Sequence, residues 1–272
     1  MSQNSDIEWT EATWNPVTGC TRVSSGCDHC YAVAMSRRLG AMGSSKYKGL
    51  VNPGKSHFNG EVRYHTDSLS IPLERKSPTL YFVNSMSDLF HDRVPNDFVR
   101  KVFEVMEIAE HHTFQILTKR PLRMMRILNE LKLRSGRRLC DDPLINVWLG
   151  TSVENQETAD DRIPLLQQTP AAVRFLSCEP LLAQVSIKPF LSRTRTSTSS
   201  PIHWVIVGGE SGPKSRPMKT DWVRTIQTDC AKADVAFFFK QWGGRSKKKT
   251  GRQLDGKEFN EMPYSRPTSN LS

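Results

Sequence analysis

Residues 113–131 read Thr113-Phe-Gln-Ile-Leu-Thr-Lys-Arg-Pro-Leu-Arg-Met-Met-Arg-Ile-Leu-Asn-Glu-Leu131 and contain one complete strand-to-helix unit. The first five residues are rich in β-branched and aromatic side chains, which is typical of a short buried strand. Proline is favoured at the first position of a helix, and Pro121 opens the helical pattern that follows. The apolar residues predicted to share one side of that helix are Leu122, Met125, Leu128 and Leu131.

The same alternation repeats along the chain. Further strands are predicted at residues 61–65, 80–84, 145–150, 173–177, 204–208 and 235–240, with a weaker one at residues 13–18. Helical patterns fill the gaps, at residues 97–111 and again at residues 222–233, where Cys230 lies on the apolar stripe. Repeated strand-helix units predict an α/β fold with a parallel sheet. This number of units favours a full or partial (β/α) barrel of the TIM type over a doubly wound sheet.

Length and composition place one domain in this chain. With 272 residues, 37% of them hydrophobic, it can bury a full core. We expect a single barrel domain over residues 1–243, a flexible insertion at residues 192–200, and a basic, partly disordered tail at residues 244–272. No apolar stretch is long enough to span a bilayer, and the first residues lack a signal pattern, so a cytoplasmic location is expected.

The net charge of +10 favours a polyanionic partner, and nucleic acid is the partner of this kind that we expect. Basic residues concentrate at residues 119–126, 132–138 and 245–252. Taken singly, each cluster is as well explained by a solvated helix face or tail.

Polar residues follow the carboxyl ends of the predicted strands. In a (β/α) barrel these ends form the face that carries the active site. Lys119 directly follows a strand, which favours contact with an anionic ligand over a merely solvated lysine. Glu179 is either a base or substrate contact, or a charge that complements a helix start. The segments concerned are residues 84–88, 117–121, 150–155, 177–180, 208–212 and 240–243, more than helix capping explains.

Three cysteines lie close together near the start of the chain, in the stretch C-T-R-V-S-S-G-C-D-H-C at residues 20–30. A structural zinc site takes four ligands, whereas a catalytic metal keeps one position open. An iron–sulfur cluster held by three cysteines likewise leaves one iron free. Cys20, Cys27 and Cys30 are therefore candidate metal ligands, while Cys140, Cys178 and Cys230 lack ligand spacing.

This loop, at residues 19–31, resembles that of the radical S-adenosylmethionine superfamily. The resemblance implies a 4Fe–4S cluster on Cys20, Cys27 and Cys30, with S-adenosylmethionine on the free iron. It also implies reductive cleavage to a 5′-deoxyadenosyl radical that abstracts hydrogen from a substrate. The usual spacing places three residues between the first two cysteines, and here there are six.

Over residues 8–243 the order of motifs is similar to that of the spore photoproduct lyase-like branch and of an uncharacterised phage-associated family with this expanded spacing. The lyase's hydrogen-donating cysteine is replaced here by Met86, which has no S–H, so the same relay is not expected. Cys178 is an alternative hydrogen donor, although a buried structural cysteine is the favoured interpretation. Carried over residue by residue, the cofactor contacts fall on His29, Tyr31, Ser87, Lys119 and Ser152, with Asp88 as a neighbouring polar candidate.

The sequence therefore predicts a radical S-adenosylmethionine enzyme of a lyase or nucleic-acid-modifying class, acting on a nucleic-acid base or nucleotide. Its catalytic candidates are Cys178 and Glu179, and it would require an electron donor of the flavodoxin or ferredoxin type. One alternative is a zinc-containing nucleic-acid-binding protein in which His29 or His57 completes the site. Another is a metal-free barrel hydrolase whose acid and base come from Glu179, Glu210 or Asp88.

Overall fold

The computed structural model describes residue 5, residues 7–191 and residues 201–263. Its centre is a seven-stranded sheet in which every neighbouring pair is parallel and the spatial order follows the chain. A doubly wound sheet would reverse its strand order at a switch point. In the described part of the chain the two outermost strands do not pair with each other, so the predicted barrel is confirmed in its partial form. The strands are β1 (Ala12–Trp14), β4 (Leu80–Val83), β5 (Thr113–Thr118), β6 (Val147–Ser152), β7 (Val173–Cys178), β8 (Trp204–Gly208) and β9 (Ala236–Gln241).

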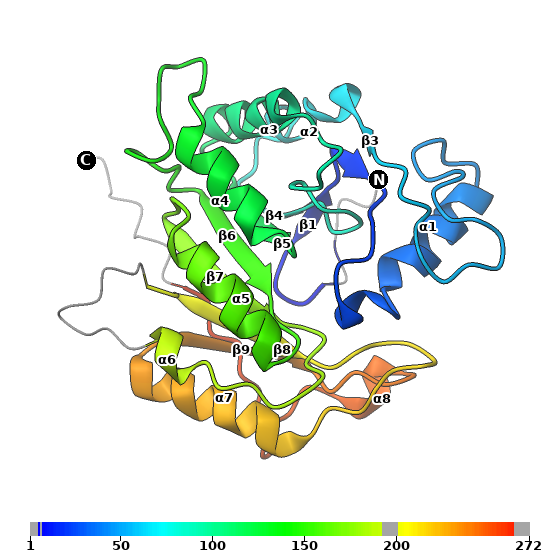
Figure 1. Ribbon diagram of the computed structural model, residues 1–272, viewed down its shortest axis with the longest axis vertical. Coiled ribbons are helices and arrows are strands. Elements are labelled where there is room, and N and C mark those ends of the chain that lie inside the picture. Colours follow the sequence, from blue (N-terminus) through cyan, green and yellow to red (C-terminus); the bar gives the residue numbers. More distant parts are fainter. Residues whose placement is uncertain (1–4, 6, 192–200, 264–272) are drawn as a thin grey trace.

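Helices wrap the outside of the curved sheet, while α1 and the loop after it project to one side (Figure 1). The long helices are α1 (Tyr31–Ala41), α3 (Asn96–Ile108), α4 (Pro121–Glu130), α5 (Gln156–Gln167) and α7 (Thr220–Ala233). The short ones are α2 (Ile71–Glu74), α6 (Lys188–Leu191), α8 (Lys247–Thr250) and the 3₁₀ turns η1 (Ser25–Cys27) and η2 (Thr66–Ser68). None of the helices in the described ranges has both the length and the apolar character that crossing a membrane requires.

Two predicted strands differ from the structure. The segment predicted at residues 13–18 is divided, because Pro16 has no N–H to give to a ladder. Its first part belongs to β1, and its second part, β2 (Val17–Thr18), pairs antiparallel with β3 (Arg63–Tyr64) in a separate two-stranded sheet. The prediction that residues 61–65 form a strand of the barrel is therefore wrong.

The apolar face of α4 also differs from its prediction. Met124, Ile127 and Leu128 are buried, whereas Leu122 is 42% exposed. Residues three apart drift around a helix that has 3.6 residues per turn, so the predicted set could not stay on one face. The buried face instead alternates three- and four-residue steps.

Two apolar clusters fill the two faces of the sheet. The larger lies between the sheet and the outer helices and includes Leu176, Cys178 and Cys230. The burial of Cys230 agrees with its predicted place on the apolar stripe of its helix. The smaller lies inside the curve and consists mainly of aromatic residues: Trp9, Phe82, Trp148, Phe175, Trp204, Ile206 and Phe238. Because side chains alternate along a strand, Phe175 faces the inside of β7 while Leu176 and Cys178 face the helices.

Part of the predicted C-terminal tail packs on the sheet. The Phe239 N–H donates to the carbonyl of Phe259 over 2.9 Å, and the Trp204 indole donates to the carbonyl of Glu261 over 2.8 Å. The boundary predicted after residue 243 therefore does not separate residues 244–263 from the barrel. The predicted insertion at residues 192–200 and the last residues, 264–272, lie outside the described residues.

Candidate functional site

A cavity of about 410 Å³ opens at the carboxyl ends of the strands. Its volume is within the range of small-molecule sites. The structure brings nearly all of the predicted site residues together in its wall: Cys20, Cys27, His29, Cys30, Tyr31, Ser87, Asp88, Lys119, Ser152 and Glu179. Cys178 is absent from this wall because it faces the opposite side of β7.

The cysteine loop, residues 19–31, crosses the mouth of the cavity. Cys27 ends the turn η1, and Cys30 is the N-cap residue of α1. Burial raises the pKa of the Cys30 thiol, against opposing hydrogen bonds from the backbone N–H groups of Ala32 and Val33. Burial, followed by the charge of Asp88, raises the pKa of the Cys20 thiol to about 12. These two thiols are therefore protonated when free, and a metal that binds them must displace their protons.

The first end of the cysteine loop is held by Asp88, which follows β4. Asp88 is 4% exposed, and its carboxylate accepts a hydrogen bond of 3.0 Å from Arg120. The same guanidinium donates to Thr21 Oγ1 over 2.7 Å and lies 3.9 Å from the sulfur of Cys20. Asp88 also accepts from Thr118 Oγ1 over 2.8 Å, so its oxygens are occupied within the protein.

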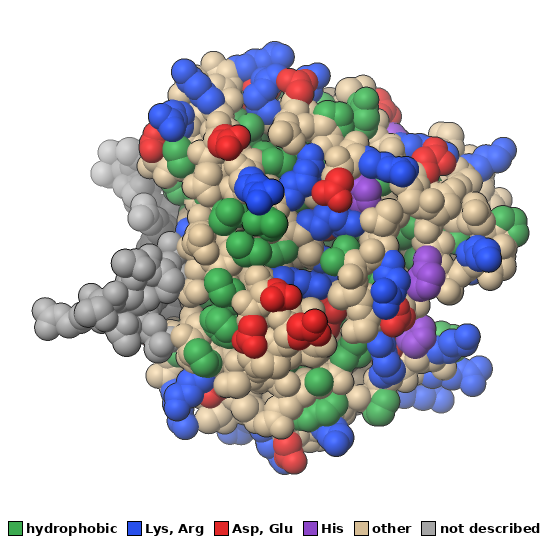
Figure 2. All heavy atoms as spheres, viewed as in Figure 1, with side chains coloured by type: hydrophobic (Ala, Val, Ile, Leu, Met, Phe, Trp, Pro, Cys, Tyr) green, Lys and Arg blue, Asp and Glu red, His purple; other side chains and the backbone are tan. Residues whose placement is uncertain are grey.

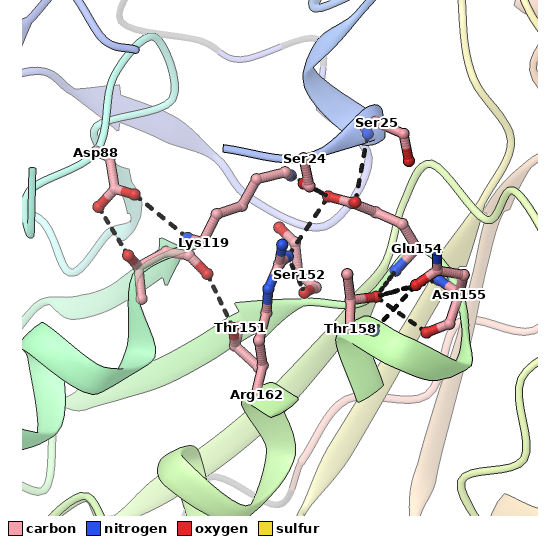
Figure 3. A network of polar contacts seen from close by, with 12 residues as sticks. Ser24, Ser25, Asp88, Lys119, Thr151, Ser152, Glu154, Asn155, Thr158 and Arg162 are labelled. Atoms are coloured by element: carbon pink, nitrogen blue, oxygen red, sulfur yellow. Dashed lines mark hydrogen bonds and ion pairs between the residues drawn. The ribbon is translucent and has the colours of Figure 1, made fainter. Parts of the chain in front are cut away.

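The middle of the loop is held by Glu154, which follows β6 and is fully buried. Its carboxylate accepts hydrogen bonds from Ser24 Oγ over 2.7 Å and from the Gly26 N–H over 3.3 Å. A side chain on Gly26 would collide with it, because an added Cβ would lie 2.5 Å from the carboxyl carbon. Two cations neutralise the carboxylate, Lys119 and Arg162, each at 3.4 Å (Figure 3).

The end of the loop is held by Glu210, which follows β8. Glu210 is 5% exposed, and its carboxylate accepts hydrogen bonds from the His29 ring over 2.9 Å and from Arg216 over 2.5 Å. Burial works to raise its pKa, but these hydrogen bonds outweigh burial and lower the pKa to about 2. Arg216 also donates to the carbonyl of Ser25 over 2.8 Å.

Three strand-end carboxylates therefore fix one loop at three successive points. They follow alternate strands of the sheet, so they approach the loop from positions spread along the rim. The sequence placed all three in polar strand-end segments, but it did not single out Glu154 or connect any of them with the cysteines. That connection depends on contacts between the loop and residues more than 90 positions further along the chain.

The other predicted cofactor residues have partners of their own. Lys119 contacts Glu154, the Tyr31 hydroxyl donates to the carbonyl of Ser85, and Ser87 Oγ donates to the carbonyl of Val17 over 2.7 Å. Ser152 is buried in the cavity wall. All of them still present atoms to the cavity.

Glu179 forms an ion pair with Lys240, with 2.7 Å between Oε1 and Nζ. Both residues line the cavity, at the ends of β7 and β9. Gly208 of the strand between them leaves room for the pair, because an added Cβ would lie 3.2 Å from the Glu179 carboxyl carbon. Cys178 is fully buried in the outer core, and burial raises the pKa of its thiol to about 12.

The donor set fits an iron–sulfur cluster better than a single metal ion. Within the described ranges, no three His, Cys, Asp or Glu side chains converge on a position for one ion. In a 4Fe–4S cluster each cysteine binds a different iron, so three sulfurs need only border the same space. The three soft thiols border this cavity, while the ring of His29, the residue before Cys30, is already bonded to Glu210.

Comparisons with known proteins gave one family and a set of solved structures. A family model described as "Protein of unknown function (DUF5131)" matches residues 4–263. No curated protein matches the chain. One matching structure is a spore photoproduct lyase mutant with bound AdoMet and dinucleoside spore photoproduct, at 13% identity and a TM-score of 0.44, covering 82% of this chain and 62% of that one. Another is spore photoproduct lyase complexed with dinucleoside spore photoproduct, at 13% identity and a TM-score of 0.43, covering 79% and 59%. The chain thus spans about three fifths of the length of these structures.

Proposed function

This chain belongs to the DUF5131 family, and we propose that it is a radical S-adenosylmethionine enzyme acting on a nucleic-acid base or nucleotide. One observation carries the proposal: three cysteine thiols from a single loop line one cavity at the carboxyl edge of a partial parallel barrel. Ligands of α/β barrels bind at this edge. A loop that supplies three thiols and no fourth ligand leaves one metal position open to a substrate or cofactor.

In this proposal Cys20, Cys27 and Cys30 hold a 4Fe–4S cluster. When bound with S-adenosylmethionine and reduced, the cluster would supply the one electron that breaks the S–C5′ bond of S-adenosylmethionine into methionine and a 5′-deoxyadenosyl radical for hydrogen abstraction. The electron comes from an external donor, of the flavodoxin or ferredoxin type that the resemblance implies. The protein contributes binding, orientation and exclusion of water, as is general for enzymes whose cofactor carries the difficult step.

The chain's own residues divide between contact and positioning. Lys119 Nζ, at a long 3.4 Å from Glu154, is the cation that we propose for the carboxylate of S-adenosylmethionine. His29, Tyr31, Ser87 and Ser152 provide the remaining contacts. Asp88 acts as a positioning residue through Arg120, since its oxygens already accept hydrogen bonds.

Charge supports the choice of substrate class. Residues 31–60, which follow Cys30, contain five Lys or Arg and no Asp or Glu. Basic side chains are spread over the face seen in Figure 2; one group of acidic side chains lies over α5, and others are scattered over the same face. An excess of positive charge near a cavity mouth attracts phosphate-bearing molecules.

The two alternatives are less well supported. A tetrahedral zinc site would need His29 or His57, and the His29 ring is held by the Glu210 carboxylate. A hydrolase would need a carboxyl group that exchanges protons near neutral pH. Glu210, with a pKa of about 2, remains ionised, and Asp88 is occupied by Arg120 and Thr118.

Anaerobic reconstitution with iron and sulfide tests the proposal. We expect a brown protein with about four iron atoms per chain that converts S-adenosylmethionine to 5′-deoxyadenosine and methionine when reduced. The Cys27→Ala variant should lose both the iron and the cleavage, whereas Cys140→Ala, which changes a cysteine outside the cavity, should keep them. A colourless protein with one equivalent of zinc would contradict the proposal.

A further inference from the structure

The excess positive charge of this chain comes from three segments. Residues 31–60, 211–220 and 243–252 contain 13 of the 38 Lys and Arg residues and none of the 28 Asp and Glu residues. The other residues carry 25 basic and 28 acidic side chains, so taken together they are slightly acidic. We call the three segments the basic rim, because the fold places them beside the opening of the cavity.

Contacts at the cavity bring the basic rim together. Tyr31 and Phe58 of its first segment line the cavity, as does Ser211 of its second segment. Ser211 forms a bridge with Gly244 of the third segment, and the Gly212 N–H donates to the carbonyl of Gly244 over 3.0 Å. Figure 1 shows α1, in the first segment, and α8, in the third, on the same side of the molecule. The charge therefore lies on both sides of the opening.

Most of the described basic side chains of the rim are not used within the protein. Lys46 is an exception, since it pairs with Asp67 over 3.2 Å. Seven others are exposed and make no ion pair or side-chain hydrogen bond with any described residue: Arg37, Arg38, Lys48, Lys55, Lys214, Arg245 and Lys249. Positive charge that the protein does not neutralise remains available to an anionic partner.

A second basic cluster, at residues 132–138, differs in both respects. It lies in the loop from α4 to β6, and therefore near the amino ends of the strands, at the edge of the sheet opposite the cavity. Its side chains are paired, Arg137 with Glu107 over 3.1 Å and Arg138 with Asp141 over 3.5 Å. Of these two clusters, only the basic rim combines unpaired charge with an adjoining cavity.

One face of α1 interleaves apolar and basic side chains. Tyr31, Met35, Arg38 and Met42 follow one another in steps of four, three and four residues, so they share a face of the helix and its C-cap. All four are exposed, and the stripe begins at Tyr31 in the cavity wall. Proteins bind single-stranded nucleic acid with surfaces of this kind, because cations contact the phosphates while apolar and aromatic side chains contact the bases.

The cavity itself favours a single strand. A base within a duplex is paired and stacked, and it cannot reach an enclosed site unless it leaves the helix. A base on a single strand can enter a cavity of about 410 Å³ while the neighbouring phosphates stay outside. Those phosphates would then lie against the unpaired cations on the two sides of the opening.

We propose that the basic rim binds the phosphate backbone of a single-stranded polynucleotide, so that the substrate is a nucleotide within a strand. The strand lies along α1 on one side of the cavity and against residues 211–220 and 243–252 on the other. DNA and RNA share this backbone chemistry. The inference rests on the proposed function, because it states the form in which the substrate of that same site is presented.

Fluorescence anisotropy of a labelled oligonucleotide of about 12 nucleotides, titrated with the full chain, tests the rim. Single-stranded DNA and RNA of one sequence are both used, and binding of either supports the proposal. Three to five phosphate contacts give a slope of about −2 to −3.5 for the logarithm of affinity against the logarithm of salt concentration. A mononucleotide, measured by competition, should bind at least about 25-fold more weakly, because it offers a single phosphate group.

Two double variants test the two sides of the opening. Arg38→Gln with Lys48→Gln removes two charges from the first segment, and Lys214→Gln with Lys249→Gln removes two from the others. Each pair should weaken oligonucleotide binding about 10- to 25-fold and reduce the salt slope by about 1 to 1.5. These side chains are exposed and unpaired, so thermal unfolding should be unchanged.

Arg134→Gln with Arg138→Gln is the matched control, because it removes the same charge from the exposed loop at the opposite edge of the sheet. Its oligonucleotide binding should stay within about twofold of the parent's. If the control weakens binding as much as the rim variants do, only net charge matters and the inference is wrong. It is also overturned if a mononucleotide binds as tightly as the oligonucleotide. Tighter binding of a blunt duplex, or of anionic lipid vesicles, would assign the surface to another partner.

The binding assay requires no cluster, so it is independent of the assay for S-adenosylmethionine cleavage. Oligonucleotide binding by a chain that does not cleave S-adenosylmethionine after reconstitution would contradict the proposed function and leave the rim as a nucleic-acid surface. Cleavage by a chain that binds no oligonucleotide, with or without the cluster, would contradict this inference alone.

Discussion

Replacing Glu154 with Gln should detach the middle of the cysteine loop from the sheet. The substitution keeps the shape of the side chain and removes its charge. Burial acts to raise the pKa of Glu154, but Lys119, Ser24 and Arg162 together lower it below the ordinary value, so the native group is ionised. The variant leaves two cations beside a neutral amide.

The expected cost follows from the contacts of this carboxylate. Removing one partner of a buried ion pair costs about 3–5 kcal/mol. Lys119 is 19% exposed and can turn toward solvent, and Arg162 keeps a bond of 2.8 Å to the carbonyl of Ser152. These two features reduce the expected loss in free energy of unfolding to about 2–3 kcal/mol.

Denaturation in guanidinium chloride measures the loss of stability, and hydrogen exchange of the amides at residues 20–30 measures the freedom of the loop. We expect faster exchange at the Gly26 N–H, which Glu154 accepts directly over 3.3 Å. Glu157→Gln is the matched control, because Glu157 is exposed three residues further on and should change stability by no more than about 0.5 kcal/mol. The reasoning would be refuted by a Glu154→Gln variant whose free energy of unfolding is within about 1 kcal/mol of the parent's and whose loop amides exchange at an unchanged rate.

Two further predictions concern the barrel interior and acid stability. Gly150→Ala should destabilise the fold by about 1–3 kcal/mol, since the added Cβ would lie 2.5 Å from the Phe175 ring. Adding Phe175→Leu to the same chain should recover part of this loss, as measured by thermal unfolding. If the losses of the two substitutions simply add, the predicted clash is absent. The pKa of Glu210 is lowered from 4.5 to about 2, so its contribution is complete above pH 4.5 and disappears as the pH falls toward 2. Between pH 4.5 and pH 2, the free energy of unfolding measured in urea should fall by about 2 kcal/mol less in Glu210→Gln than in the parent. An unchanged pH profile would argue against the hydrogen bonds of Glu210.

Most of the barrel could be predicted from local patterns. Six of the eight predicted strands, and part of a seventh, recur in the sheet, because their alternation and flanking turn residues do not depend on distant contacts. Residues 61–65 show why a strand-like pattern is insufficient. They pair with residues next to the cysteine loop, so their place in the molecule depends on a partner more than 40 positions away. Nor does composition show that the basic segment after residue 243 packs on β9.

The candidate site was predictable in its residue types and not in their partners. The three cysteines and Lys119 could be named because each follows a recognisable signal, a cysteine spacing or the end of a strand, whereas Ser152 was named from the family resemblance. Glu154 has no such signal of its own, since an acidic residue at a strand end is ordinary in sequence. It becomes distinctive only when Ser24 and Gly26 are found against it.

The sequence alone determined the parallel sheet, the number of thiols and the edge of the sheet at which polar residues gather. These depend on short-range periodicity and spacing, which the chain carries whatever its tertiary structure. Only the tertiary structure decided which face of β7 Cys178 occupies, which carboxylates hold the loop, and which buried polar atoms stay unpaired. Those outcomes depend on burial and on partners distant in sequence, because a buried charge or amide is defined by what surrounds it.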